Sequence, residues 1–390
     1  MSKAYVRAGW EVDFLVLGDL TARKAMEAKC IALNRQSPHA WWEGKFIPWL
    51  GDFLAGEYAC HDSAAWADVT RQLPQKIDVI SVEHPWLWSL AKRIQGLPQF
   101  KHVKLIYSSQ NVETAMKAEF LASLDIPQLP LLMQRIEQTE RNAVLEADLV
   151  TVVSQSDFDA FSHWGAKKVL LAENGISPWN ASEAQMDEWS KKLPRGKWPL
   201  YVSSAHPPNF LGFAEALGWN LGAIPPDSRL VLAGGAAAFI EQQFIPSLTQ
   251  AQADPPQVNQ ARFAALNESR IRCLGVLPEA DLNAVKSLAS AFVLPIASGG
   301  GTNIKTAEAL MSGAYVIGTP LAFRGYESFM DFPTVRIANT PQQFSDALRE
   351  ILAPSQITPS LNADQLRALG GLNWECRLEF IPRHAQSVLS

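Results

Sequence analysis

The residues best placed to do chemistry lie between positions 299 and 308, where the chain reads GGGTNIKTAE. Consecutive glycines let a backbone approach a ligand without side-chain collision. The residues from Asn303 onward have the apolar spacing of a helix, and a helix N-terminus offers unpaired N–H groups with about half a positive charge. The segment therefore predicts an anion-binding loop that leads into a helix.

Two charged residues stand in this segment, Lys305 and Glu308. A cation in the first helical turn faces the positive end of the helix dipole, and a bound diphosphate would convert that penalty into attraction. The alternative is a surface ion pair at i,i+3 spacing, worth about 0.2–0.5 kcal/mol. The glycines and the small neighbours Ala307 and Ala309, which leave the carboxylate open, favour a ligand site.

The motif matches neither GxGxxG nor the GxxxxGK[ST] pattern of a P-loop, so dinucleotide binding and ATP hydrolysis lack their required residues. Its context is more informative. The stretch SAFVLPIASGGGTNIKTAEALMSGAYVIGTP reads as strand, loop, helix and strand, with the glycines before the helix. This arrangement favours phosphate binding at the helix start.

Short β-branched runs alternate with helical stretches along the chain, as in parallel sheets covered by helices on both faces. We predict strands in the first half at residues 12–17, 77–82, 103–107, 149–153 and 169–172. In the second half we predict strands at 200–203, 229–233, 271–274, 291–295, 315–318 and 335–338. The predicted helices include 2–8, 131–146, 209–217, 279–288, 303–311 and 341–352. The predicted fold class is α/β, with two doubly wound, Rossmann-like domains.

A stretch rich in turn formers and charge follows Asn174-Gly175 and predicts a linker over residues 177–197. Ligands of open parallel sheets bind at the carboxyl ends of the strands. Two such domains therefore predict a site in a central cleft. The expected domains are 1–176 and 198–372, followed by a terminal helix over 373–390.

The start of the chain departs from this pattern. Residues 2–8 read as a helix that leads through Gly9 into the strand EVDFLVLG, whereas a doubly wound domain normally begins with a strand. We therefore expect the central first strand to be missing, through a start downstream of the true one, unless another segment fills its place. An unfilled position would leave backbone groups of a buried sheet unpaired.

The composition of the chain argues against several classes of function. The formal charge of −5 and the absence of Lys and Arg runs argue against nucleic acid as a partner. The four cysteines form no CxxC pair, so we expect reduced thiols and no metal site. No run approaches the roughly 18–20 apolar residues of a membrane span. We expect a cytoplasmic protein, and peripheral contact with the inner membrane face stays open.

An aromatic run covers residues 41–54 and has no clean helical or strand period. Such a segment could be a lid that faces an acceptor or lipid. The more common alternative is a loop packed on its own domain.

The glycine-rich unit resembles the corresponding segment of the retaining GT-B glycosyltransferases of family 4, in the subgroup with a triple-glycine loop. In the first half, SSQNVETAMKAEF, RNAVLEADLVTVVSQSD and ENGIS resemble further family segments. In the second half, LYVSSAHPPN and RCLGVLPEADLNAVKSLASAFVLP do so, and NWECRLEFIPRH resembles the terminal helix that crosses back to the first domain. The resemblance covers nearly the whole chain apart from the first strand.

This resemblance implies that the amides around the glycine loop hold the diphosphate of a nucleotide sugar and that Glu308 accepts hydrogen bonds from the ribose. The usual Arg and Lys after the first strand of the second domain are absent here, and Lys305 is the best substitute, followed by Arg324. The residues implied to contact the donor are Gly299, Gly300, Gly301, Thr302, Asn303, Ile304, Gly275, Val276, Ser204 and Arg324.

Two further positions depart from the family pattern. Gly300 stands where many members have a second acidic residue that contacts the sugar. Gln110 stands where the family has a histidine near the transferred sugar, and an amide can hydrogen-bond a hydroxyl but cannot become cationic. His84 could supply another imidazole to the cleft, with a capping or buried histidine as the alternative.

The implied function is transfer of a hexosyl-like sugar from a nucleoside-diphosphate sugar to an acceptor hydroxyl with retention, without a metal or other cofactor. The acceptor would be a glycan, a lipid-linked compound or another hydroxyl, and Lys305, Glu308 and Gln110 would act at the reacting sugar and diphosphate. One alternative is a nucleotide-sugar epimerase, which needs acid/base carboxylates that Gly300 does not supply. Another is a noncatalytic nucleotide-sugar-binding or partner subunit, suggested by the substitutions at Gly300, Gln110 and Ser204.

Overall fold

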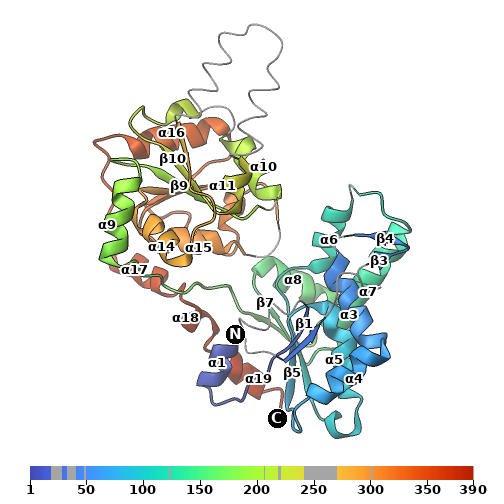
Figure 1. The fold of residues 1–390 in the computed structure, drawn as a ribbon. Helices are drawn as coiled ribbons and strands as arrows, with labels where there is room; N and C mark the ends of the chain where they lie inside the picture. Colours follow the sequence, from blue (N-terminus) through green and yellow to red (C-terminus); the bar gives the residue numbers. More distant parts are fainter. Residues whose placement is uncertain are drawn as a thin grey trace. The chain divides into compact units, whose positions relative to one another are not determined.

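A computed structural model describes residues 1–18, 29–32, 41–47, 50–122, 124–205, 207–217, 221–240, 270–299 and 302–389 (Figure 1). The chain divides into two compact units. The first comprises Met1–Glu173 and Arg377–Ser390, and the second comprises Asn174–Cys376. Both are built from parallel strands that alternate with helices, as the sequence predicts.

The main sheet of the first unit has four parallel strands in the order β5-β6-β7-β8. They are β5 (Val79–Val82), β6 (Lys104–Ser108), β7 (Leu149–Val152) and β8 (Val169–Leu171). The helices are α3 (Gly51–His61), α4 (Ser63–Gln72), α5 (Trp88–Gln95), α6 (Glu113–Leu121), α7 (Leu129–Glu146) and α8 (Gln155–Trp164). β7 is buried along its whole length, as expected for a strand covered on both faces.

Two further parallel strands of this unit, β1 (Leu15–Gly18) and β2 (Lys29–Ala32), form a separate sheet. Within the described residues, β1 pairs with β2 alone and β5 pairs with β6 alone. β1 is half-exposed along its length, whereas β7 is buried. The short helix α1 (Ser2–Arg7) precedes β1, as predicted.

Most of the aromatic run packs within the first unit. Trp41–Trp42 and Lys45–Phe46 form the antiparallel hairpin β3–β4. Trp42 joins a buried cluster that also contains Phe53 from α3 and Trp86 from the chain after β5. The alternative of a segment packed on its own domain therefore holds for these residues, while the Trp41 and Phe46 side chains are exposed. Trp49 lies outside the described residues.

The second unit has a six-stranded parallel sheet in the order β11-β10-β9-β12-β13-β14. The strands are β9 (Pro199–Val202), β10 (Leu230–Ala233), β11 (Ile271–Cys273), β12 (Ala291–Leu294), β13 (Tyr315–Gly318) and β14 (Val335–Ile337). The helices include α10 (Pro207–Ala216), α11 (Gly235–Phe239), α14 (Glu279–Leu288), α15 (Ile304–Met311), α16 (Pro341–Leu352) and α17 (Ala363–Gly370). Every strand and helix predicted in this half is present.

The predicted linker over residues 177–197 is wrong in its centre, which forms helix α9 (Glu183–Lys192). Ser182 and Gln185 close a capping box at its start. The Trp189 side chain is buried in the core of the second unit, and its Nε1 donates to Oδ1 of Asp281 on α14 at 3.1 Å. The segment is therefore a packed part of the second unit, which begins at Asn174.

The expected terminal helix over residues 373–390 is two short helices, α18 (Trp374–Leu378) and α19 (Ile381–Gln386). Pro382 stands at the start of α19, where a residue without an N–H group interrupts helical hydrogen bonding. Residues from Arg377 onward belong to the first unit, where α19 contacts α1. The return of the chain to the first domain is thus as expected.

Candidate functional site

The strand order of the second unit reverses on either side of β9. From β9 the chain builds outward through β10 and β11, and then returns to the other side of β9 with β12, β13 and β14. In open parallel sheets, ligands bind where the order reverses, beside the carboxyl ends of the two central strands. Here those ends lead into Ser203 after β9 and into the glycine loop after β12.

The start of α15 is uncapped. Gly299 has φ +125°, a conformation that favours glycine, while Gly300 and Gly301 lie outside the described residues. Asn303 is the N-cap residue, but its side chain makes no capping hydrogen bond. Its Nδ2 atom is a buried donor with no partner among the described residues. The first turn thus presents donors suited to an anion, and Ile304 beside them is exposed.

The ammonium group of Lys305 bridges the switch point. Its Nζ atom donates to Oγ of Ser203 at 2.7 Å and to Oδ1 of Asn209 at 2.9 Å. Ser203 follows β9 and Asn209 lies on α10, so the side chain reaches from α15 to the end of β9, across the point where the strand order reverses. Ser204 is exposed, and its Oγ and carbonyl oxygen accept hydrogen bonds from the amide of Asn209.

The electrostatic environment of Lys305 is unusual. Burial lowers its pKa to about 8, against a smaller opposing effect of the Glu308 carboxylate. Both hydrogen-bond partners of the ammonium are neutral, so its charge is poorly compensated where it lies. A partly desolvated cation of this kind is stabilised when an anion binds beside it.

Thr302 and Gly299, which flank the undescribed part of the glycine loop, contact neighbouring segments. Oγ1 of Thr302 accepts a hydrogen bond of 2.6 Å from Nδ2 of Asn174, and the Tyr326 hydroxyl donates to the carbonyl of Asn174 at 3.1 Å. Gly325 has φ +80°, and a Cβ atom there would lie 2.4 Å from Cγ2 of Thr302. Nη1 of Arg324 donates to the carbonyl oxygen of Gly299 at 2.5 Å. These contacts fix the position from which α15 starts.

Glu308 lies on α15 one turn after Lys305, but the structure directs the two side chains to different partners. Oε1 of Glu308 lies 3.6 Å from Nζ of Lys286, a buried side chain of α14. The Lys286 ammonium also stands 4.3 Å from the ring centroid of Trp179. The structure therefore does not show a simple surface pair between Lys305 and Glu308. The Glu308 carboxylate is instead oriented by Lys286 on the neighbouring helix α14.

Lys286, Trp179, Asn174 and Tyr326 are site residues that the sequence analysis did not identify. Lys286 could have been suspected, because it lies on the buried face of a predicted helix. The predicted residues Gly275 and Val276 follow β11 at the same edge of the sheet. Gly275 has φ +66° and its carbonyl accepts from Gly234 at 2.7 Å, while the Val276 side chain is exposed.

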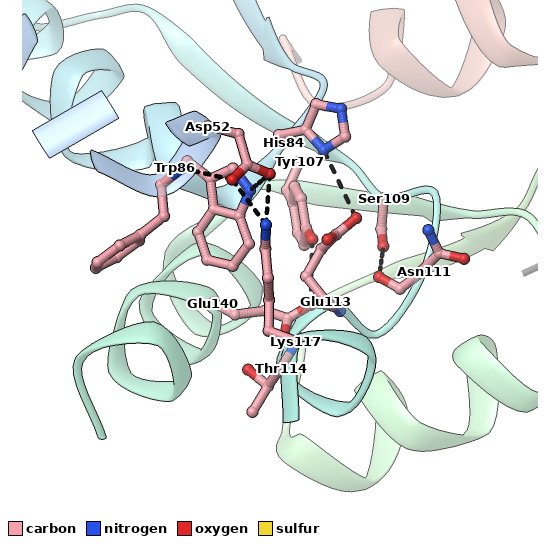
Figure 2. A network of polar contacts seen from close by, with 11 residues as sticks. Asp52, His84, Trp86, Tyr107, Ser109, Asn111, Glu113, Thr114, Lys117 and Glu140 are labelled. Atoms are coloured by element: carbon pink, nitrogen blue, oxygen red, sulfur yellow. Dashed lines mark hydrogen bonds and ion pairs between the residues drawn. The ribbon is translucent and has the colours of Figure 1, made fainter. Parts of the chain in front are cut away.

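Gln110 belongs to the first unit, where it lies half-buried in the loop between β6 and α6. A polar network surrounds this loop (Figure 2). The buried carboxylate of Glu140 accepts 2.7 Å hydrogen bonds from the amides of Glu113 and Thr114, and so caps the start of α6 from the neighbouring helix α7. The network positions the chain on either side of Gln110.

A second part of this network joins α3 to α6. Nζ of Lys117 lies 2.7 and 2.8 Å from the two carboxylate oxygens of Asp52. Asp52 also accepts hydrogen bonds from the indole of Trp86, at 3.0 Å, and from the amide of Phe53, at 2.8 Å. The Lys117 side chain is buried, so this pair has a structural role.

In the part of the chain that the structure describes, no group of three or more His, Cys, Asp or Glu side chains is arranged to hold a metal ion. Over the same residues, no helix has both the length and the apolar character needed to cross a membrane.

No protein-family model matches the sequence, and no curated protein matches it. Similar solved structures include the sucrose-phosphate synthase of Thermosynechococcus elongatus, with 15% identity, coverage of 99% of this chain and 90% of that chain, and a TM-score of 0.62. HepE of Anabaena in complex with UDP has 13% identity, coverage of 96% and 100%, and a TM-score of 0.64. The α,α-trehalose 6-phosphate synthase of Burkholderia multivorans has 12% identity, coverage of 97% and 100%, and a TM-score of 0.56. This likeness confirms the predicted GT-B fold class.

Proposed function

We propose that the protein is a glycosyltransferase that moves a sugar from a nucleoside-diphosphate sugar to an acceptor hydroxyl with retention of configuration. The second unit would bind the donor at its switch point. The acceptor would be a hydroxyl of a glycan or a lipid-linked compound, and neither a metal nor another cofactor would take part.

The contact of Lys305 with Ser203 and Asn209 is the observation that carries this proposal. The sequence has no Lys or Arg between Ser203 and Asn209, and Lys305 supplies a cation there from the helix that follows the glycine loop. Negative charge develops on the departing diphosphate during transfer. A preorganised ammonium and helix amides stabilise that charge more in the transition state than in the ground state.

Glu308 would accept hydrogen bonds from the ribose hydroxyls. Lys286 lies beside one of its carboxylate oxygens, Oε1. The other oxygen can therefore accept hydrogen bonds from a ligand. Arg324, which fastens Gly299, would contribute a second positive charge near the diphosphate.

The ligands bound in similar structures support this class of donor. HepE of Anabaena was solved with UDP-glucose, at 13% identity and a TM-score of 0.61. The catalytic domain of starch synthase IV from Arabidopsis thaliana was solved with ADP and acarbose, at 13% identity and a TM-score of 0.53. We therefore propose a uridine or adenosine diphosphate sugar as donor.

The test is a thermal-shift screen of UDP-, ADP- and GDP-sugars, followed by measurement of nucleoside diphosphate release from each sugar that binds. We expect Lys305→Ala to lower turnover at least tenfold. Lys191→Ala, which changes an exposed lysine of α9 in the same unit, should leave it unchanged. Binding without any release in the wild type would instead support the noncatalytic subunit, and interconversion of donor sugars would support the epimerase.

A further inference from the structure

The network of the first unit contains one carboxylate that its neighbours leave unsatisfied. Asp52 and Glu140 each accept several hydrogen bonds, as described above. Glu113 is only 1% exposed, yet neither of its carboxylate oxygens has a hydrogen-bond partner among the described residues. Burial of a polar group without a hydrogen bond costs roughly 1–3 kcal/mol. Such a group calls for an explanation in terms of function.

Glu113 is held in place from two sides. It is the first residue of α6, and its own amide donates to Glu140, which fixes the first turn of the helix. One turn later, Lys117 is clamped by Asp52. The Glu113 side chain therefore has little freedom to rotate toward another hydrogen-bond donor. Its desolvation lowers the stability of the folded protein.

His84 is the residue that Glu113 faces (Figure 2). Nδ1 of His84 lies 3.6 Å from Oε1 of Glu113. The Glu113 side chain is 2% exposed, whereas the imidazole is 50% exposed. His84 comes two residues after β5, so the pair stands at the carboxyl edge of the sheet, where ligands of parallel sheets bind. A carboxylate behind Nδ1 orients the ring so that Nε2 is available to a ligand.

We propose that His84 and Glu113 form the acceptor site of the first unit, in which Nε2 of His84 hydrogen-bonds a hydroxyl of a neutral sugar and Glu113 positions the ring. The inference rests on the proposed function and names the acceptor class for it. His84 is the ligand-contacting residue, and Glu113 is a positioning residue.

The charges around His84 favour a neutral acceptor. The carboxylates of Glu113, Asp52 and Glu83 raise the pKa of the imidazole, with the Glu113 carboxylate, 3.6 Å from Nδ1, as the largest influence, while burial opposes them. The Lys117 ammonium on α6 forms an ion pair with Asp52. Glu140 adds a further carboxylate behind Glu113. Carboxylates thus outnumber the neighbouring cations, which are Lys117 and the Met1 ammonium beside Glu83, and this disfavours a phosphate group. Sugar hydroxyls, by contrast, can donate to carboxylates and accept from an imidazole.

The test uses the full chain with ¹⁵N-labelled histidine and follows the imidazole signals by NMR during titration with methyl glycosides of glucose, galactose, mannose and N-acetylglucosamine. Glucose 6-phosphate is the charged comparison. We expect at least one neutral glycoside to shift the His84 signals saturably and to bind at least tenfold more tightly than glucose 6-phosphate. Saturation by no glycoside, or equal binding of the phosphate, would overturn the proposal.

Variants separate the two roles. His84→Ala should weaken glycoside binding at least tenfold, while His102→Ala, at an exposed histidine of the same unit, should not. Glu113→Gln should lower the pKa of His84 and weaken binding, a change in titration that loss of packing alone would not produce. Unchanged binding in His84→Ala, or an unchanged His84 pKa in Glu113→Gln, would contradict the assignment.

The same samples also test the donor site separately from the acceptor site. UDP is titrated into each variant, and its affinity should be unchanged by His84→Ala because the donor site belongs to the second unit. Failure of UDP to bind the wild type would count against the donor proposal, while the glycoside titration would still decide the acceptor proposal.

Discussion

Nζ of Lys305 lies 2.7 Å from Oγ of Ser203, although the two residues are 102 positions apart in the sequence. The contact joins the helix after the glycine loop to the end of the strand on the other side of the switch point. Among the described residues, the ammonium is received there by a hydroxyl and an amide oxygen. This partly desolvated ammonium, whose hydrogen-bond partners are neutral, is the basis of the predictions that concern the donor site.

The first prediction is that Lys305→Met weakens UDP binding at least tenfold, or about 1.4 kcal/mol, and at the same time raises the melting temperature of the free protein. The lowered folded-state pKa means that the unfolded chain binds one more proton between pH 8 and about 10.5. The lysine therefore destabilises the fold most below pH 8, and its removal should stabilise most there. Thermal melts at pH 7 and pH 10, with Lys191→Met as control, check this. Equal destabilisation at both values would contradict it.

The second prediction concerns the pH dependence of UDP binding. A diphosphate beside Lys305 raises the pKa of its ammonium above 8, so binding takes up a proton when the pH exceeds that value. Affinity should change little well below pH 8, should already be lower at pH 8, and should fall up to tenfold per unit above it. Calorimetry in two buffers of different ionisation enthalpy measures the proton uptake directly. Lys305→Met should show none, and uptake that persists in this variant would point to another group.

The third prediction tests the ribose contact. Glu308→Ala should weaken UDP binding at least tenfold but should leave binding of 2′,3′-dideoxy-UDP nearly unchanged, because the lost hydrogen bonds are those to the ribose hydroxyls. Glu279→Ala changes an exposed carboxylate of α14 and serves as control. Equal losses for both nucleotides would mean that Glu308 acts through the fold and not through the ribose.

The fourth prediction distinguishes the effect of backbone strain at a glycine from the effect of its contact with Thr302. Gly325 and Gly196 both have φ +80°, but a Cβ atom would meet Thr302 only at Gly325 and nothing within 4 Å at Gly196. Alanine at Gly196 should cost about 1 kcal/mol of stability, measured by urea unfolding, and alanine at Gly325 should cost more because its Cβ atom also clashes with Thr302. Only Gly325→Ala displaces the glycine loop, so it alone should weaken UDP binding, by about fivefold or more. Equal affinities in the two variants would exclude a role for the Thr302 contact.

The fifth prediction concerns the stability of the first unit. Asp52→Asn removes the charge that compensates the buried Lys117, whose side chain is 6% exposed, and should cost about 2 kcal/mol. Asp68→Asn breaks the exposed pair with Arg71 and should cost less than about 0.5 kcal/mol. Urea unfolding of both variants makes the comparison. Similar costs would show that the Lys117 pair is as weak as a surface pair.

The strands and the glycine loop could be predicted from the sequence because their signal is local. Buried strands such as β12 and β13 are continuous apolar runs bounded by turn formers, and the glycines stand directly before an apolar helical pattern. Helix α9 was missed because its sequence is polar and its attachment depends on the single buried side chain of Trp189. A capping box within a charged stretch is a weak signal on its own.

The contacts that build the two sites are not local and could not be predicted. Asn174 and Thr302 are 128 positions apart, and only the folded sheet brings them to 2.6 Å. Likewise, Lys305 was expected to face a diphosphate, but its bond to Ser203 follows from the strand order. The unpaired oxygens of Glu113 are visible only once the neighbouring helices have taken their places. Periodicity identifies buried faces, whereas polar partners across a fold depend on topology.

The central claim is that the second unit binds a nucleoside diphosphate through Lys305, and calorimetric titration of UDP tests it most directly. The wild type should bind UDP saturably at one site at pH 7.5, Lys191→Met should bind with the same affinity, and Lys305→Met should bind at least tenfold more weakly. Equal affinity of the wild type and Lys305→Met, or no binding of UDP or ADP by the wild type, would contradict the account.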